Sequence, residues 1–110
     1  MEGIYNLEVL QALISEKRGV LLYFSNDMCS VCRVLKPKVE ELLSADFPQI
    51  EARFIDIDKS PVLSGQYRVF TIPTILIFFD GNEQARLSRN ISLHQLREII
   101  ERPYLLIFGD

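Results

Sequence analysis

The sequence is poor in the features that mark several classes of protein. Of its 110 residues only two are cysteine and one is histidine, and five glycines and five prolines are spread along the chain. Two cysteines are too few for the disulfide framework of a small secreted protein, and so little glycine and proline excludes collagen and low-complexity disorder. The hydrophobic and charged fractions, 48% and 25%, are those of a globular protein. The length fits one domain, residues 1–110.

The chain also lacks an excess of basic charge and a long apolar run. Twelve Lys and Arg against fifteen Asp and Glu leave a net charge of −3, which offers phosphate backbones and anionic lipids no basic face. The longest uncharged apolar stretch, residues 69–79, is interrupted by Pro73 and is shorter than the roughly 20 residues of a membrane span. No secretory leader is visible at the start. We therefore expect a cytoplasmic protein that binds neither nucleic acid nor membrane.

What is present is an alternation of helical patterns with short apolar strands. Helices are expected over residues 7–17, from Cys29 to about Ala45, from Pro61, and over about residues 93–101, and strands over residues 20–24, 52–57, 74–79 and 84–87. Asp80-Gly81 predicts a hairpin turn, Pro37 a kink inside the second helix, and Pro103 the end of the last helix. The order predicts an α/β fold, a mixed four-stranded sheet flanked by helices.

The two cysteines, Cys29 and Cys32, stand at the start of the second helix. Residues three apart on a helix share a face, so a disulfide closes with little backbone motion. Cys29 would meet unpaired backbone N–H groups and the positive end of the helix dipole, which favour its thiolate. Cys29 is then the nucleophile that attacks a substrate disulfide, and Cys32 resolves the mixed disulfide. The cycle needs no cofactor in this chain.

Two other interpretations of the cysteine pair remain open. Buried cysteines often serve only as small apolar side chains. Zinc takes four ligands, and the chain offers only the two thiolates and His94, so a zinc site would need four cysteines from two subunits. A C-x-x-C motif between an apolar strand and an amphipathic helix, within a β-α-β unit, favours the redox interpretation.

From about Tyr5 to Glu101 the sequence resembles the thioredoxin family. The resemblance lies in the strand 20–24 before Cys29-Ser30-Val31-Cys32, in Pro37, in Ile72-Pro73-Thr74, in Asp80-Gly81 and in residues 92–100. It implies a thioredoxin-like fold whose first strand is absent or a stub. It also implies reduction of protein disulfides, as part of cell redox homeostasis, with electrons from a thioredoxin reductase-like enzyme or a small thiol.

In this family the proline that Pro73 matches is cis and stands beside the cysteine pair. A cis Pro73 would expose the Ile72 backbone for pairing with an extended substrate segment, which places the target disulfide over Cys29. Met28 and Thr71 join this expected substrate-binding site.

Several residues depart from the family pattern. Met28 replaces the usual tryptophan, Ser30-Val31 replaces Gly-Pro, Tyr23 replaces a buried aspartate, Phe54 replaces its lysine partner, and Thr71 and Arg89 replace glycines of a flat docking surface. Loss of the buried carboxylate removes a base for Cys32, so we expect long-lived mixed disulfides. The surface around Cys29 should be bulkier, more charged and more selective.

Two alternatives to an enzyme are a non-enzymatic binding or assembly module of the same fold, and a redox sensor whose disulfide switches its affinity for a partner. The module would use Met28, Ile72 and the tail, residues 103–110, as apolar contacts. Within the tail, residues 104–108 are five consecutive apolar residues after the expected helix end. Such a segment either covers its own chain or adds to a second copy and builds a homodimer.

Overall fold

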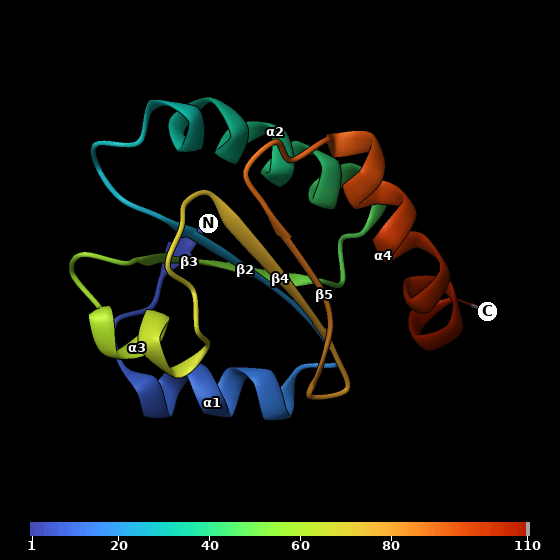
Figure 1. The fold of residues 1–110 in the computed structure, drawn as a ribbon. Coiled ribbons are helices and arrows are strands. Elements are labelled where there is room, and N and C mark those ends of the chain that lie inside the picture. Colours follow the sequence, from blue (N-terminus) through green and yellow to red (C-terminus); the bar gives the residue numbers. More distant parts are fainter. Residues whose placement is uncertain (110) are drawn as a thin grey trace.

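The computed structural model describes residues 1–109, and its elements form three layers with a sheet in the middle (Figure 1). The strands are β1 (Glu2–Gly3), β2 (Gly19–Ser25), β3 (Glu51–Asp56), β4 (Thr74–Phe79) and β5 (Asn82–Ser88). The helices are α1 (Leu7–Glu16), α2 (Ser30–Asp46), α3 (Pro61–Gln66) and α4 (Leu93–Phe108). Helices α2 and α4 cover one face of the sheet, and α1 and α3 cover the other.

The sheet is mixed, in the order β1-β3-β2-β4-β5. Strands β1, β3 and β2 are parallel, and β4 and β5 are antiparallel to their neighbours. The expected α/β class is therefore confirmed, with five strands instead of four. The additional strand is a two-residue stub in which Glu2 and Gly3 lie opposite Arg53 and Phe54. A stub this short has no strand periodicity of its own, and only its pairing with β3 defines it.

Central strand β2 separates two hydrophobic clusters. Leu21 and Tyr23 point to the cluster under α2 and α4, whereas Val20, Leu22 and Phe24 belong to the cluster over α1 and α3. All five are fully buried. A strand covered on both faces is apolar at every position, which explains the unbroken run that predicted it.

The turn between β4 and β5 has the predicted hairpin chemistry. Asp80 and Gly81 have φ angles of 50° and 81°. Two consecutive left-handed residues define the turn that matches the twist of a hairpin, and glycine takes this conformation without steric cost.

No helix among residues 1–109 is long and apolar enough to cross a bilayer.

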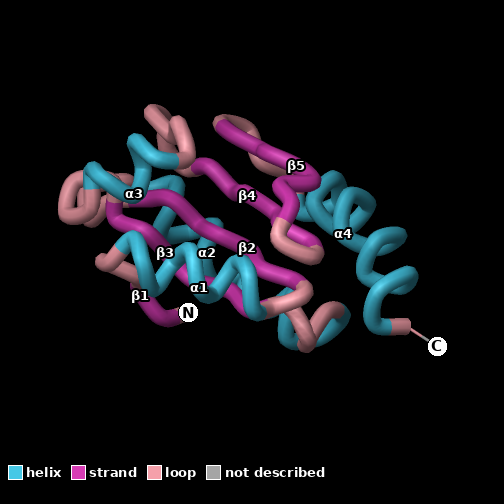
Figure 2. Tube along the Cα trace, turned by 90° about the horizontal axis from the view of Figure 1, so that it is seen from below, coloured by secondary structure: helices cyan, strands magenta, loops and turns pink. Residues whose placement is uncertain are grey.

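The prediction that Pro103 ends the last helix is wrong. Helix α4 contains Pro103 and continues to Phe108, and Figure 2 shows its last turns running past the edge of the sheet. Tyr104 is buried, with its ring 5.0 Å from that of Phe47 and 4.9 Å from that of Phe108. Its hydroxyl also accepts the N–H of Gln49 at 3.1 Å. These contacts stabilise the helix beyond a proline that removes one of its hydrogen bonds.

Most of the apolar segment 104–108 therefore covers its own chain. Leu105 and Leu106 are the exceptions, with 60% and 77% of their surface exposed. Of the expected tail, Asp110 lies outside the described residues.

Candidate active site

The cysteine pair lies where β2 gives way to α2. Cys29 is the N-cap of α2, and its Sγ accepts the backbone N–H of Cys32 at 3.1 Å. The two residues form a disulfide, with their Cα atoms 5.2 Å apart. Cys29 is partly exposed and Cys32 is buried, with 3% of its surface accessible. After reduction, the same N–H and the helix N-terminus would stabilise a thiolate at Cys29, the more accessible sulfur.

The peptide bond between Ile72 and Pro73 is cis, as the sequence resemblance predicts. Phe24 of β2 lies opposite Thr74 of β4, so the chain leaves β2 toward the cysteines at the same edge where Pro73 leads into β4. The Arg89 N–H donates to the carbonyl of Pro73 at 3.4 Å. Three segments therefore meet at this edge: the loop before α2, the cis proline, and the connection from β5 to α4.

Tyr23 lies directly under the second cysteine. It is fully buried, and its hydroxyl donates to the carbonyl of Cys32 at 2.7 Å. Burial raises the pKa of Tyr23 to about 12, because a phenolate would lose its hydration. At neutral pH this hydroxyl is a hydrogen-bond donor and accepts no proton from Cys32.

Phe54 adds no ionisable group at this point either. Its ring carries the ammonium group of Lys36, whose Nζ lies 4.0 Å from the ring centroid. This cation–π contact occupies the place at which the resemblance expects a lysine paired with a carboxylate. Tyr23 and Phe54 thus place two aromatic rings where the family pattern has an aspartate and a lysine.

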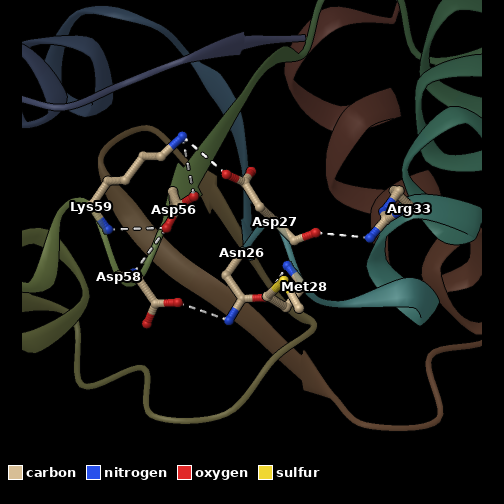
Figure 3. A network of polar contacts seen from close by, with 7 residues as sticks. All are labelled: Asn26, Asp27, Met28, Arg33, Asp56, Asp58 and Lys59. Atoms are coloured by element: carbon tan, nitrogen blue, oxygen red, sulfur yellow. Dashed lines mark hydrogen bonds and ion pairs between the residues drawn. The ribbon is translucent and has the colours of Figure 1, made fainter.

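A polar network anchors the loop that leads to Cys29 (Figure 3). The amide of Asn26 donates to Asp58 at 3.0 Å, and its oxygen accepts the N–H of Met28 at 3.1 Å. Arg33 donates to the carbonyl of Asp27 at 2.8 Å. These bonds connect the loop before Cys29 both to the turn after β3 and to the first turns of α2.

The same network contains a lysine between two carboxylates. Lys59 lies 3.2 Å from Asp27 and 3.9 Å from Asp56 (Figure 3). The pKa of Lys59 is raised, chiefly by its hydrogen bond with Asp27. The buried Asp56 also accepts the N–H groups of Asp58 and Lys59. This network has no signal in the sequence, because its partners come from segments that only the sheet brings together.

The expected substrate-binding residues differ in exposure. Met28 has 86% of its surface exposed and Thr71 is exposed, whereas Ile72 is half-buried and Pro73 is buried. An exposed aromatic side chain, Phe70 with 75% of its surface accessible, was not anticipated. Phe70 follows buried Val69 in an apolar stretch, and the apolar pattern alone suggests core. Val31 and Val34, each with 60% exposed, extend the apolar surface along α2.

Within the part of the chain that the structure describes, His94 does not belong to a group of side chains that could hold a metal ion. It lies on α4, exposed, with its Nε2 2.7 Å from Glu98. Residues 1–109 contain no group of three or more His, Cys, Asp or Glu side chains that could hold a metal ion.

Comparisons with known proteins agree with this geometry. The family model described as Thioredoxin matches residues 4–102. The thioredoxin-like protein YdfQ of Bacillus subtilis is 31% identical over 110 residues, which are 100% of this chain and 97% of that protein. A bifunctional thioredoxin reductase/thioredoxin of Mycobacterium leprae is 28% identical over 75 residues, 68% of this chain and 16% of that protein.

Solved structures share the same fold. The X-ray structure of Fasciola hepatica thioredoxin superposes with a TM-score of 0.82 at 31% identity, covering 93% of this chain and 98% of that one. The five-stranded mixed sheet with helices on both faces is therefore a thioredoxin-like fold, as expected.

Proposed function

Because this chain belongs to the thioredoxin family of thiol–disulfide oxidoreductases, we propose that it reduces disulfide bonds in proteins through Cys29 and Cys32. The observation that carries the proposal is the Cys29–Cys32 disulfide at the N-terminus of α2, at the sheet edge where the cis Pro73 leads into β4. A pair with one accessible and one buried sulfur is suited to sequential attack and resolution.

The reaction begins with the dithiol form. The Cys29 thiolate attacks one sulfur of the substrate disulfide, which breaks, and the other substrate sulfur leaves as a thiolate and takes a proton. Cys32 then loses its proton to water and attacks the Cys29 sulfur. The mixed disulfide breaks, the second substrate thiol leaves, and Cys29 and Cys32 form their own disulfide. Two electrons pass from the cysteine pair to the substrate.

The substrate segment is held beside Cys29 by residues of the loops around it. The extended segment pairs with the backbone of Ile72, next to the cis Pro73, in the manner of an added strand. Met28 and Thr71 flank this segment and contact its side chains. Both are exposed at the surface.

Resolution of the mixed disulfide is slow in this proposal. Tyr23 is a buried donor to Cys32, and its pKa of about 12 means that it accepts no proton from Cys32 at neutral pH. Asp27 and Asp56 line the same hollow as Cys32, and both are paired with Lys59. We expect the mixed disulfide with Cys29 to accumulate in the wild-type protein. Rapid acid quenching and thiol alkylation would measure its lifetime, with Cys32→Ser as the upper limit. Release as fast as in an ordinary thioredoxin would contradict this step.

The dithiol form must be regenerated by an electron donor. A thioredoxin reductase-like enzyme or a small thiol fits this role, and the M. leprae relative carries a reductase and a thioredoxin in one chain by its name. The cysteine pair itself carries the electrons, so the reaction uses no cofactor of this chain. A cytoplasmic location fits a reductase, because the cytosol keeps thiols reduced.

The first experiment is a redox titration of the cysteine pair against defined dithiol buffers, read by alkylation gel shift. A reversible two-electron couple near the cytosolic poise, or more reducing, supports a reductase. A clearly more oxidising couple would favour an oxidant, an isomerase or the redox sensor. If no intramolecular disulfide forms, the exchange mechanism fails.

The runner-up function is a binding module that uses the exposed apolar side chains of Met28 and Phe70. Reduction of insulin by dithiothreitol separates the two functions, because a module predicts no acceleration. Binding of a module to its partner would also survive Cys29→Ser, whereas the reductase loses its activity in that variant.

A further inference from the structure

A groove runs from the redox motif along α2. Its volume is about 570 Å³, and the connection from β5 to α4 forms its opposite wall. Figure 1 shows this connection beside α2. Six of the lining residues are Ser30, Val31, Val34, Lys38, Arg89 and Ile91. The groove begins next to Cys29 and is therefore within reach of a substrate segment whose disulfide lies over that sulfur.

The wall of this groove is apolar and its charges are all positive. Val31 and Val34 expose their side chains, and none of the Asp and Glu residues among residues 1–109 lines the groove. Lys38 and Arg89 are both exposed, and within residues 1–109 neither forms an ion pair. Arg33, also on α2, donates to the backbone carbonyl of Asp27.

Two carboxylates stand near Lys38 from the side away from Cys29. Glu41 and Asp46 line the adjoining hollow together with Lys38. Asp46 pairs with Arg97, and Glu41 makes no ion pair with Lys38. Arg89 lines the groove and not the adjoining hollow, so it does not share a surface with these carboxylates. Its positive charge is therefore less compensated than that of Lys38.

The backbone of Arg89 holds its side chain at this site. Its φ angle is 62°, the left-handed region that a residue with a side chain adopts only when its surroundings impose it. Here its N–H donates to the carbonyl of Pro73, and its own carbonyl accepts the N–H of Ile91 at 2.6 Å. The residue that carries the charge is thus bonded to the proline that shapes the substrate site.

We propose that Lys38 and Arg89 make this groove selective for substrate segments that combine an apolar side chain with carboxylates. The inference rests on the proposed reduction of protein disulfides and names the class of substrate. The apolar side chain fills the space along Val31 and Val34, and the carboxylates pair with the two cations. The net charge of −3 acts against acidic substrates in general, so a preference for them must come from a local cluster of positive charge.

The test compares three disulfide-bonded peptides that differ at four positions, two on each side of the target cysteine. All four positions are Glu in one peptide, Gln in the second and Lys in the third. All three peptides contain the same leucine, which supplies the apolar side chain. The reduced protein should react with the Glu peptide about tenfold faster than with the Gln peptide at low ionic strength, and slowest with the Lys peptide. Added salt should reduce the difference, because it screens exposed charges.

Matched variants locate the preference. Arg89→Gln with Lys38→Gln should bring the Glu and Gln peptides to equal rates. Arg89→Gly, which suits the left-handed backbone, should give a partial loss in a variant that folds readily. Arg102→Gln removes an exposed charge from α4, outside the groove, and should leave the preference intact.

Three outcomes would overturn the inference. Equal rates for the Glu and Gln peptides in the wild type would refute it and leave the reductase function standing. So would an equal loss of preference in Arg102→Gln, which would assign the effect to overall charge. If the protein reduced none of the peptides and also failed to reduce a small aromatic disulfide, the proposed function would be refuted, and the inference with it.

Discussion

At the scale of single residues, the most informative position is Tyr23. The hydroxyl of Tyr23 donates to the Cys32 carbonyl and stays uncharged over the physiological pH range. The chain thus combines a redox-active pair with an aromatic support. This hydrogen bond and the packing of the Tyr23 ring both contribute to stability near the disulfide.

Tyr23→Phe removes that hydrogen bond and keeps the ring. We expect the free energy of unfolding at neutral pH to fall by about 1 kcal/mol, the usual net value of a buried hydrogen bond. Urea unfolding of both proteins, in the oxidised form, measures the difference.

The pH dependence of this difference has a definite sign. Burial raises the pKa of Tyr23 from 10.0 to about 12, so its contribution to stability is complete below pH 10 and is lost as pH rises toward 12. The advantage of the wild type over Tyr23→Phe should therefore shrink across that range. Other titrating groups are common to both proteins and cancel. A constant difference from pH 7 to 12 would show that Tyr23 is not a buried donor.

At the scale of secondary-structure elements, α4 shows packing prevailing over local preference. Pro103 costs a helix interior about 3 kcal/mol relative to alanine, yet the helix reaches Phe108. Tyr104 and Phe108 hold these last turns. Tyr104 contacts Phe47 and Phe108, and Phe108 lies close to Gly19. The last turns of α4 thus belong to the core that α2 and α4 share with the sheet.

Two substitutions on α4 separate its buried and exposed faces. Tyr104→Ala should lower the free energy of unfolding by about 3 kcal/mol, because it deletes a buried ring and the acceptor for Gln49. Leu106→Ala, on the exposed face, should change it by about 0.5 kcal/mol or less. Urea denaturation compares the two. Equal effects would mean that the end of α4 does not pack as described.

At the scale of the whole molecule, the segment 104–108 bears on the oligomeric state. With Tyr104 buried in its own chain, Leu105 and Leu106 remain as the exposed large apolar residues at the end of α4. Two side chains are far short of the roughly 800 Å² per partner that stable interfaces bury.

We therefore predict that the chain sediments as a monomer of 12.7 kDa at micromolar concentration. Truncation after Pro103 should lower the thermal midpoint and leave the sedimenting mass unchanged. A mass of twice the monomer that returns to the monomer value in Leu105→Ser with Leu106→Ser would support the homodimer instead.

Features that depend on neighbouring residues could be predicted from the amino-acid sequence. The apolar run of β2, the C-x-x-C motif at a helix start and the Asp80-Gly81 turn each carry a local physical signal, and the structure has all three. The cis Pro73 was predicted from family resemblance, since an X–Pro bond has no strong local preference for cis.

Features that depend on contacts distant in sequence could not be predicted in this way, because folding brings their partners together. The stub β1 forms because it pairs with the edge of β3. Helix α4 continues beyond Pro103 because Tyr104 packs against Phe47. Exposure of Phe70 and the left-handed Arg89 were equally invisible in the sequence. Local propensities amount to at most a few kcal/mol, and long-range burial of a single aromatic ring is enough to override them.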